Sequence, residues 1–132
     1  MLFCKKEKGK SPIYPEVVYA RTNAEFLNQK FGTSYKSWMK SRWPYDEDTW
    51  VWMVRFDGKN RGGWKNLILD ADEIWEEYVG ESTPTYIGDT TKHRIAVAVL
   101  EGRQGREYHI LGKFKLDEAR STRGRHVLRR VE

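Results

Sequence analysis

The sequence predicts an α+β fold: a strongly bent antiparallel sheet or a small open β-barrel, accompanied by two or three helices. Strand-like and helix-like segments follow one another in the order strand, helix, candidate helix, two strands, helix and three strands. Only turns and irregular connections separate the last three strands, so we expect them to pair as antiparallel neighbours. The chain lacks the regular alternation of strand and helix that is typical of a parallel nucleotide-binding sheet.

Length and composition predict one folded domain. The 132 residues, of which 39% are hydrophobic and 14% aromatic, can bury a core without metals or disulfides. We assign residues 12–132 to this domain and expect residues 1–11 to form a basic flexible tail. The N-terminus lacks a signal-peptide pattern, no apolar run is long enough to span a membrane, and the single cysteine is Cys4. These features predict a cytoplasmic protein with no membrane association.

The first part of the chain is predicted to hold a strand and two helices. Residues 13–19 contain a valine pair followed by tyrosine, which predicts a short strand. A helix is expected over 23–31, because Thr22 can cap its first turn and Gly32 offers a left-handed stop. A second short helix is expected over 35–43, where the proline that follows would end it.

The central region is predicted to contain a hairpin and a further helix. Residues 50–56 and 64–69 are rich in aromatic and aliphatic residues and are joined by a glycine-containing loop, which predicts two paired strands. Asp70 can cap a helix over 71–79, in which apolar residues recur at helical spacing. Loop signals follow over 81–91.

Three strands are predicted at the C-terminus, over 94–100, 106–116 and 125–131. A tight glycine turn joins the first two, and a longer connection leads to the third. Alternation along the second strand directs Tyr108 and Phe114 toward the core.

One sequence pattern in this region resembles a known family. The segments His93 to Val99 and Glu107 to Phe114 contain the pattern Tyr-x-x-Leu-Gly-x-Phe. Residues 92–131 thereby resemble the small PUA-like β-barrel modules that accompany restriction nucleases and read modified DNA. The resemblance implies a nucleic-acid reader in which an aromatic cage receives a flipped base. It assigns no individual residue of this chain to that cage.

Charge is distributed unevenly along the chain. The total is +5, with +3 over residues 1–10, −4 over 11–91 and +6 over 92–132. Two basic ends favour an acidic partner. Nucleic acid is the first candidate, and an acidic protein surface is the alternative.

Aromatic and basic residues together supply the candidate site. Trp50, Trp52 and Trp75 are favoured as core, whereas other aromatic residues have basic neighbours and could stack on bases beside phosphate contacts. His109 and Lys113 face away from the predicted core, and arginines cluster on the last connection. Plain packing or solvated charge is the alternative for each candidate. The candidate nucleic-acid contacts are Lys36, Trp38, Lys40, Arg42, Trp43, Trp64, His109, Lys113, Arg120, Arg123 and Arg125.

Catalysis is the weaker hypothesis for this chain. It has no phosphate-binding loop, no zinc signature and no nucleophile motif. The carboxylates at 46–48 and 70–73 are explained by turn and helix-capping chemistry, which leaves a metal-dependent nuclease as a minor alternative. No cofactor is predicted.

These observations together predict a non-enzymatic nucleic-acid-binding domain. In the more specific version of this prediction, the domain reads a modified or unpaired base with an aromatic pocket and an arginine-rich face. The alternative is a small protein-interaction or inhibitor module that binds an acidic protein surface. The sequence does not distinguish DNA from RNA, and it does not set the oligomeric state.

Overall fold

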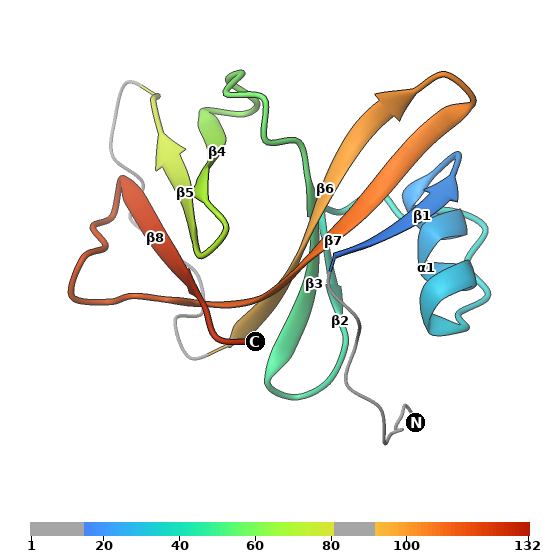
Figure 1. Cartoon of the computed structure of the whole chain (residues 1–132), viewed down its shortest axis with the longest axis horizontal. Helices are drawn as coiled ribbons and strands as arrows, with labels where there is room; N and C mark the ends of the chain where they lie inside the picture. Colours follow the sequence, from blue (N-terminus) through green and yellow to red (C-terminus); the bar gives the residue numbers. More distant parts are fainter. Residues whose placement is uncertain (1–14, 81–91) are drawn as a thin grey trace.

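A computed structural model describes residues 15–80 and 92–132, in which eight strands form one sheet with a single helix beside it (Figure 1). The predicted tail and the predicted loop over 81–91 lie outside the described residues. The elements are β1 (Glu16–Ala20), α1 (Asn23–Phe31), β2 (Arg42–Pro44), β3 (Thr49–Val54), β4 (Trp64–Asp70), β5 (Glu73–Tyr78), β6 (His93–Gly102), β7 (Gly105–Leu116) and β8 (Arg125–Arg130).

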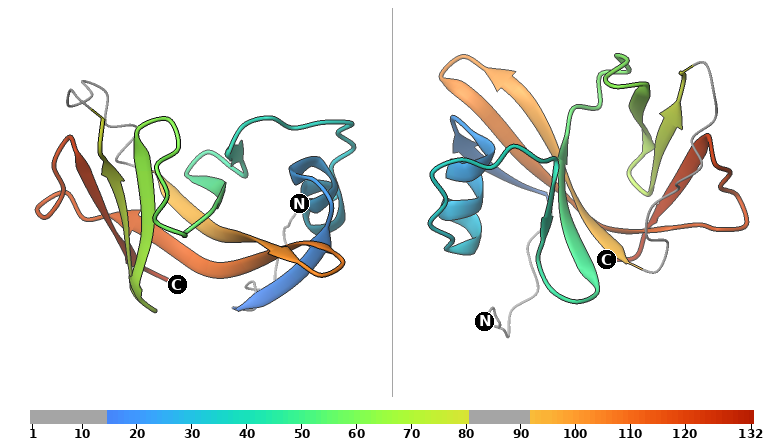
Figure 2. Two further views of the ribbon diagram at one scale, coloured as in Figure 1. Left: turned by 90° about the horizontal axis from the view of Figure 1, so that it is seen from above. Right: turned by 180° about the vertical axis from the view of Figure 1, so that it is seen from behind.

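The sheet is open and mixed. Its strand order is β2-β3-β6-β7-β8-β5-β4, and β1 pairs with the first half of β7. Every pairing is antiparallel except that of β3 with β6. Strands β6 and β7 run between a group formed by β4, β5 and β8 and a group formed by α1 and β1 (Figure 2). The predicted α+β fold with a sheet and helices is therefore confirmed only in part: the sheet is mixed rather than antiparallel, because β3 and β6 are parallel, and the described residues are mostly β with one helix instead of two or three.

The bend of the sheet is located on β7. Its first half pairs with β1 and its end pairs with β8, and the register with β6 shifts between Ala96 and Val97, opposite Gly112. Gly112 has φ 147, a conformation that residues with a Cβ rarely adopt. A Cβ at this position would also meet the guanidinium of Arg130. The glycine of the Tyr-x-x-Leu-Gly-x-Phe pattern therefore sits at the irregularity, where the strand changes partners.

The bend separates two hydrophobic clusters. On one side of the sheet, α1 buries Phe26 and Leu27 against alternate residues of the central strands. The ring of Phe26 stacks on Tyr108 with centroids 4.6 Å apart. The bend curls the sheet, and the second cluster, which includes Trp52 and Phe114, lies inside this curl. Its buried members are Trp52, Ile74, Ala96, Phe114, Leu116 and Leu128.

Helix α1 has the predicted bounds and caps. The Thr22 hydroxyl accepts a hydrogen bond from the Glu25 backbone N–H, and Gly32 adopts the left-handed conformation at φ 73. The second predicted helix, over 35–43, is wrong. The side chain of Asn28 hydrogen-bonds both the N–H and the C=O of Tyr35, which holds this segment in a non-helical path.

The predicted helix over 71–79 is also wrong, because this segment is strand β5. The spacing of its apolar residues is compatible with a helix and with a strand. Backbone pairing with β4 and β8 makes this segment a strand. Ile74 faces the inside of the curl, whereas Trp75 lies on the outer face beneath the guanidinium of Arg125, 4.3 Å from the ring centroid. The predicted core position of Trp75 on a helix is thus corrected to a half-buried position on a strand.

The predicted hairpin between segments 50–56 and 64–69 is wrong. β3 pairs with β2 and β6, and β4 pairs with β5 across a tight turn in which Asp70 accepts the N–H of Asp72. Segments 50–56 and 64–69 therefore belong to opposite ends of the sheet. The three C-terminal strands and their antiparallel order are confirmed. Among the described residues, no helix has the length and apolar character needed to cross a membrane.

Candidate nucleic-acid interface

A cavity of about 330 Å³ opens between the two ends of the curled sheet, and we call it the seam cavity. Strands β3 and β4, which do not pair with each other, supply opposite walls. Its lining residues are Asn23, Ser41, Trp52, Met53, Val54, Arg55, Arg61, Trp64, Asn66, Glu76, Val99 and Arg106. The cavity is thus built from segments that only the curl of the sheet brings together.

A polar row crosses the inner face of the sheet beside this cavity. Asn66 on β4 is the register partner of Glu76 on β5, and Glu76 is in turn the partner of His126 on β8. Arg94 reaches the same carboxylate from β6. Side chains from β5, β6 and β8 therefore form one hydrogen-bonded set inside the curl, and Asn66 on β4 lies beside it.

Glu76 is the charged centre of this row. One of its oxygens, Oε1, accepts from His126 Nδ1 at 2.8 Å and from the Arg94 guanidinium at 3.2 Å. Burial raises the pKa of Glu76, but these hydrogen bonds and the charges of His126 and Arg94 outweigh it, so the pKa lies below its usual value. The carboxylate stays ionised, and its second oxygen has no hydrogen bond from the described residues.

Two buried polar atoms in this region have no hydrogen-bond partner among the described residues: Asn66 Oδ1 and His126 Nε2. Leaving a buried acceptor unpaired costs about 1–3 kcal/mol. Asn66 lines the seam cavity, and His126 is 3% exposed. Buried polar atoms are normally hydrogen-bonded, so the unpaired Asn66 Oδ1 is a candidate acceptor for a polar ligand in this cavity.

Two tryptophans, Trp52 and Trp64, also line the seam cavity. Trp64 is half-buried and contacts two rings, Tyr78 at 5.1 Å between centroids with the planes at 66°, and His126 at 5.3 Å with the planes at 34°. A Cβ on Gly63 would collide with the Tyr78 ring, so a glycine at this position allows the close packing that fixes Trp64. On the opposite wall, Trp52 packs beneath Arg94 at 4.7 Å. Trp52 is buried, so the half-buried indole of Trp64 is the ring that can contact a planar heterocyclic ligand.

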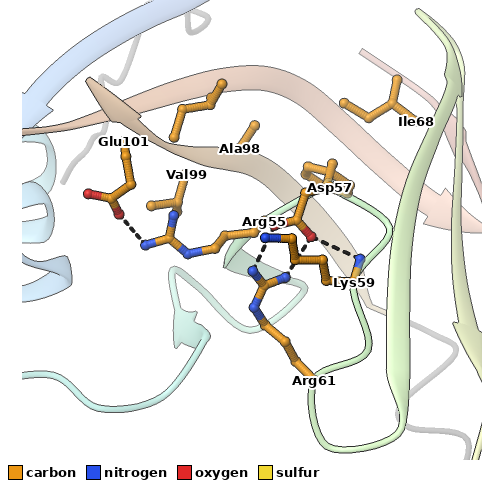
Figure 3. Close-up of a pocket in the computed structure, with 10 residues that line it drawn as sticks. Arg55, Asp57, Lys59, Arg61, Ile68, Ala98, Val99 and Glu101 are labelled. Carbon is orange, nitrogen blue, oxygen red and sulfur yellow. Dashed lines mark hydrogen bonds and ion pairs between the residues drawn. The ribbon is translucent and has the colours of Figure 1, made fainter. Parts of the chain in front are cut away.

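A second cavity of about 530 Å³ adjoins the first, and we call it the loop cavity. The segment between β3 and β4 forms one wall, and the end of β6 forms another (Figure 3). Charged residues and apolar side chains both contribute. Its lining residues are Arg55, Phe56, Asp57, Lys59, Arg61, Ile68, Ala98, Val99, Leu100 and Glu101.

Of the contacts predicted from the sequence, Trp64 lines the seam cavity. Trp38 and Trp43 instead pack against the cluster beneath α1, and both indole N–H groups have internal acceptors, the Arg42 carbonyl and the Tyr35 hydroxyl. Arg42 also covers Trp50 at 4.5 Å from the ring centroid. Lys36 and Lys40 are exposed beside them. The last five predicted contacts lie elsewhere, on β7 and around β8.

His109 and Lys113 lie on β7, half-buried, and pair with Glu107 and Glu132 respectively. Neither residue belongs to the lining of the seam cavity or of the loop cavity. Their role as contacts remains a prediction.

The predicted arginine group lies on the outer face of β5 and β8, away from the polar row. Arg120 makes two hydrogen bonds to Glu73, at 2.8 and 2.9 Å, and lowers the pKa of that carboxyl to about 2. Arg125 pairs with Glu77 at 2.8 Å, and Arg123 is exposed. Two of the three are therefore already bound to carboxylates of the protein.

The residues that sequence reasoning missed are Asn66, Glu76 and Arg94. Assigning 71–79 to a helix hid the alternation that points Glu76 into the curl. Asn66 carries no signal in the sequence, because its importance comes from being unpartnered in a cavity wall. Among the described residues, no group of three or more His, Cys, Asp or Glu side chains is arranged to hold a metal ion.

Comparison with known proteins identifies the family of the chain. Residues 12–132 match the model of the SET and RING associated domain, SRA. No curated protein matches the chain. Among solved structures, the chain is similar to the 5-hydroxymethylcytosine-specific restriction enzyme AbaSI, with 25% identity and a TM-score of 0.70, over 89% of this chain and 39% of that one. The chain thus spans well under two thirds of that enzyme's length.

The PUA-like resemblance drawn from residues 92–131 is therefore confirmed, and the family match extends it across the predicted domain. SRA domains bind DNA and are reading rather than catalytic modules. The chain belongs to the SRA domain family.

Proposed function

We propose that this domain binds DNA and takes one modified or unpaired base into the seam cavity. The observation that carries the proposal is the unpartnered, buried Asn66 Oδ1 in a wall that also holds Trp64 and the ionised Glu76. A base inside a duplex is inaccessible to such a wall, so the target nucleotide must rotate out of the stack. Unstacking costs a few kcal/mol, which contacts in the cavity repay.

The chemistry of the wall favours a cytosine-type base. Asn66 Oδ1 and the free oxygen of Glu76 are acceptors, and they suit the exocyclic amino group of cytosine better than the carbonyl of thymine or uracil. Trp64 supplies a face for stacking. The name of AbaSI specifies 5-hydroxymethylcytosine, and we therefore propose a cytosine modified at its 5-position as the ligand.

Binding of labelled duplexes tests the proposal. Three duplexes of one sequence, with cytosine, 5-methylcytosine or 5-hydroxymethylcytosine at a single position, are compared by fluorescence anisotropy at several salt concentrations. We expect tighter binding to a modified duplex and a log–log decrease of affinity with salt. Equal affinity for all three duplexes and for one with an unpaired base would contradict base reading.

Variants of two tryptophans locate the site. Trp64→Ala should cost about 1–3 kcal/mol of binding, which raises Kd about 5- to 150-fold. Trp75→Ala is the matched control, because this ring is half-buried like Trp64 but lies on the outer face of β5. If Trp75→Ala weakens binding as much as Trp64→Ala does, the base is not bound in the seam cavity.

A further inference from the structure

The segment between β3 and β4 is held rigidly by its own hydrogen bonds. Asp57 accepts two hydrogen bonds from the Arg61 guanidinium, both at 2.7 Å, and a third from the Lys59 N–H at 3.0 Å. Asn60 accepts the Gly63 N–H at 2.8 Å. The backbone of Arg61 pairs with that of Trp64, so the position of this arginine is coupled to a wall of the seam cavity.

Arg55 is held in a similar way at the other side of the loop cavity. Its guanidinium hydrogen-bonds Glu101 at the end of β6, and Arg106 approaches the same carboxylate at 3.7 Å. Figure 3 shows Arg55 and Arg61 with their carboxylate partners around the cavity. Both carboxylates are engaged by arginine, and the charge of Lys59 also acts on Asp57 without a side-chain hydrogen bond between the two. The loop cavity therefore has a cationic rim in which carboxylates hold the two arginines in place.

The two cavities share Arg55, Arg61 and Val99 in their walls. A flipped nucleotide rotates about its backbone, so its flanking phosphates stay at the mouth of the pocket that receives the base. If the base enters the seam cavity, those phosphates lie at the shared wall. Arginine suits this position, because its planar guanidinium can hold one carboxylate and still donate to a phosphate oxygen.

We propose that Arg55, Lys59 and Arg61 on the rim of the loop cavity bind the DNA phosphodiesters that flank the read nucleotide, with Asp57 and Glu101 as positioning residues. This inference rests on the proposed function, because the read base fixes where the phosphates lie. Asp57 and Glu101 act through the arginines that they orient. Arg61 keeps N–H donors beyond the two that Asp57 receives, and 44% of its side chain is exposed to solvent.

The positioning role predicts the sign of a charge effect. Removing a carboxylate near DNA normally raises affinity, because it removes repulsion from phosphates. Asp57→Asn should do the opposite and raise Kd about 2- to 10-fold, the cost of ordering one freed arginine side chain on binding. Glu101→Gln should raise Kd in the same range. The matched control is Glu118→Gln, an exposed carboxylate outside both cavities, which should leave Kd unchanged or lower it.

Salt dependence provides a readout that a merely structural role would not change. Arg61→Gln should make the slope of log affinity against log salt shallower by about one, because one phosphate contact is lost. Arg103→Gln, in the turn between β6 and β7 and outside both cavity linings, is the control for loss of an exposed arginine. Thermal melts establish that each variant is folded. If Asp57→Asn does not fold, the salt slope of Arg61→Gln alone tests whether Arg61 contacts a phosphate.

The outcomes separate this inference from the proposed function. If the wild type discriminates modified DNA but Asp57→Asn and Glu101→Gln bind as tightly as wild type or tighter, the positioning role is wrong. An unchanged slope for Arg61→Gln refutes the phosphate contact. If all three variants behave as expected but the wild type does not distinguish modified from unmodified duplexes, the phosphate site stands and base reading fails. Absence of any DNA binding refutes both.

Discussion

Replacing Asn66 with alanine tests the site through an unusual combination of effects. Asn66 Oδ1 is buried without a hydrogen-bond partner among the described residues. An unpaired buried acceptor costs about 1–3 kcal/mol, and removing it recovers that cost. The few side-chain contacts that are lost offset part of the gain. We therefore expect the free energy of unfolding of Asn66→Ala to stay within about 1 kcal/mol of wild type or to rise.

Binding should change in the opposite direction. If Asn66 Oδ1 accepts a hydrogen bond from the base, its removal leaves a ligand donor unpaired in the seam cavity. That loss is worth about 1–3 kcal/mol, which is about a 5- to 150-fold increase in Kd for the modified duplex. Affinity for the unmodified duplex should fall less, because phosphate contacts dominate non-specific binding.

Urea unfolding and fluorescence anisotropy measure the two quantities on the same preparation. Lys65→Ala is the matched control, because Lys65 is the neighbouring residue on β4 and alternation directs it to the opposite face. Its effect should be small on stability and equal for modified and unmodified DNA. If Asn66→Ala lowers stability by several kcal/mol and leaves the Kd ratio unchanged, Asn66 is a structural residue and the seam cavity is not the reading site.

Three further predictions concern stability. Glu76→Gln should lower the free energy of unfolding by about 3–5 kcal/mol, because the Arg94 side chain, which is 7% exposed, keeps its charge without a carboxylate partner. A loss below about 1 kcal/mol in urea unfolding would contradict this prediction. The hydrogen bonds from Arg120 hold the pKa of Glu73 at about 2, below the usual 4.5. The contribution of ionised Glu73 to the free energy of unfolding is therefore present above pH 4.5 and is lost as the pH falls toward 2. Glu73→Gln should flatten this part of the curve of stability against pH. Trp43→Ala should cost about 3 kcal/mol of stability, because its ring packs on Phe31 at 5.2 Å; loss of DNA affinity with an unchanged melting temperature would instead support the predicted nucleic-acid contact.

Local signals in the sequence predicted those elements whose structure depends on near neighbours. Helix α1 was predicted with its bounds because Thr22 and Gly32 supply capping groups within the helix's own turns. The C-terminal strands were predicted because alternation and tight turns specify antiparallel neighbours. The same region carried the Tyr-x-x-Leu-Gly-x-Phe pattern, whose glycine lies at the irregularity of β7. The family resemblance was therefore readable without a structure.

Long-range pairing decided what local signals could not. The apolar residues of segment 71–79 fit a helix and a strand equally, and only its neighbours β4 and β8 select the strand. Segments 50–56 and 64–69 are close in sequence, yet they end at opposite ends of the sheet.

By itself the sequence determined a basic, aromatic-rich domain, its first helix, its antiparallel C-terminal strands and its resemblance to PUA-like modules, because composition, capping and turn chemistry are properties of each segment. The predicted contacts followed charge and aromaticity, and of these Trp64 alone lines either of the two cavities described above. The tertiary structure alone decided that Asn66, Glu76 and His126 form one row and that Arg61 borders two cavities. The physical reasons are the pairing of β4, β5 and β8, which sets the three residues of the row side by side, and the curl of the sheet, which brings β3 and β4 to one cavity although they do not pair with each other.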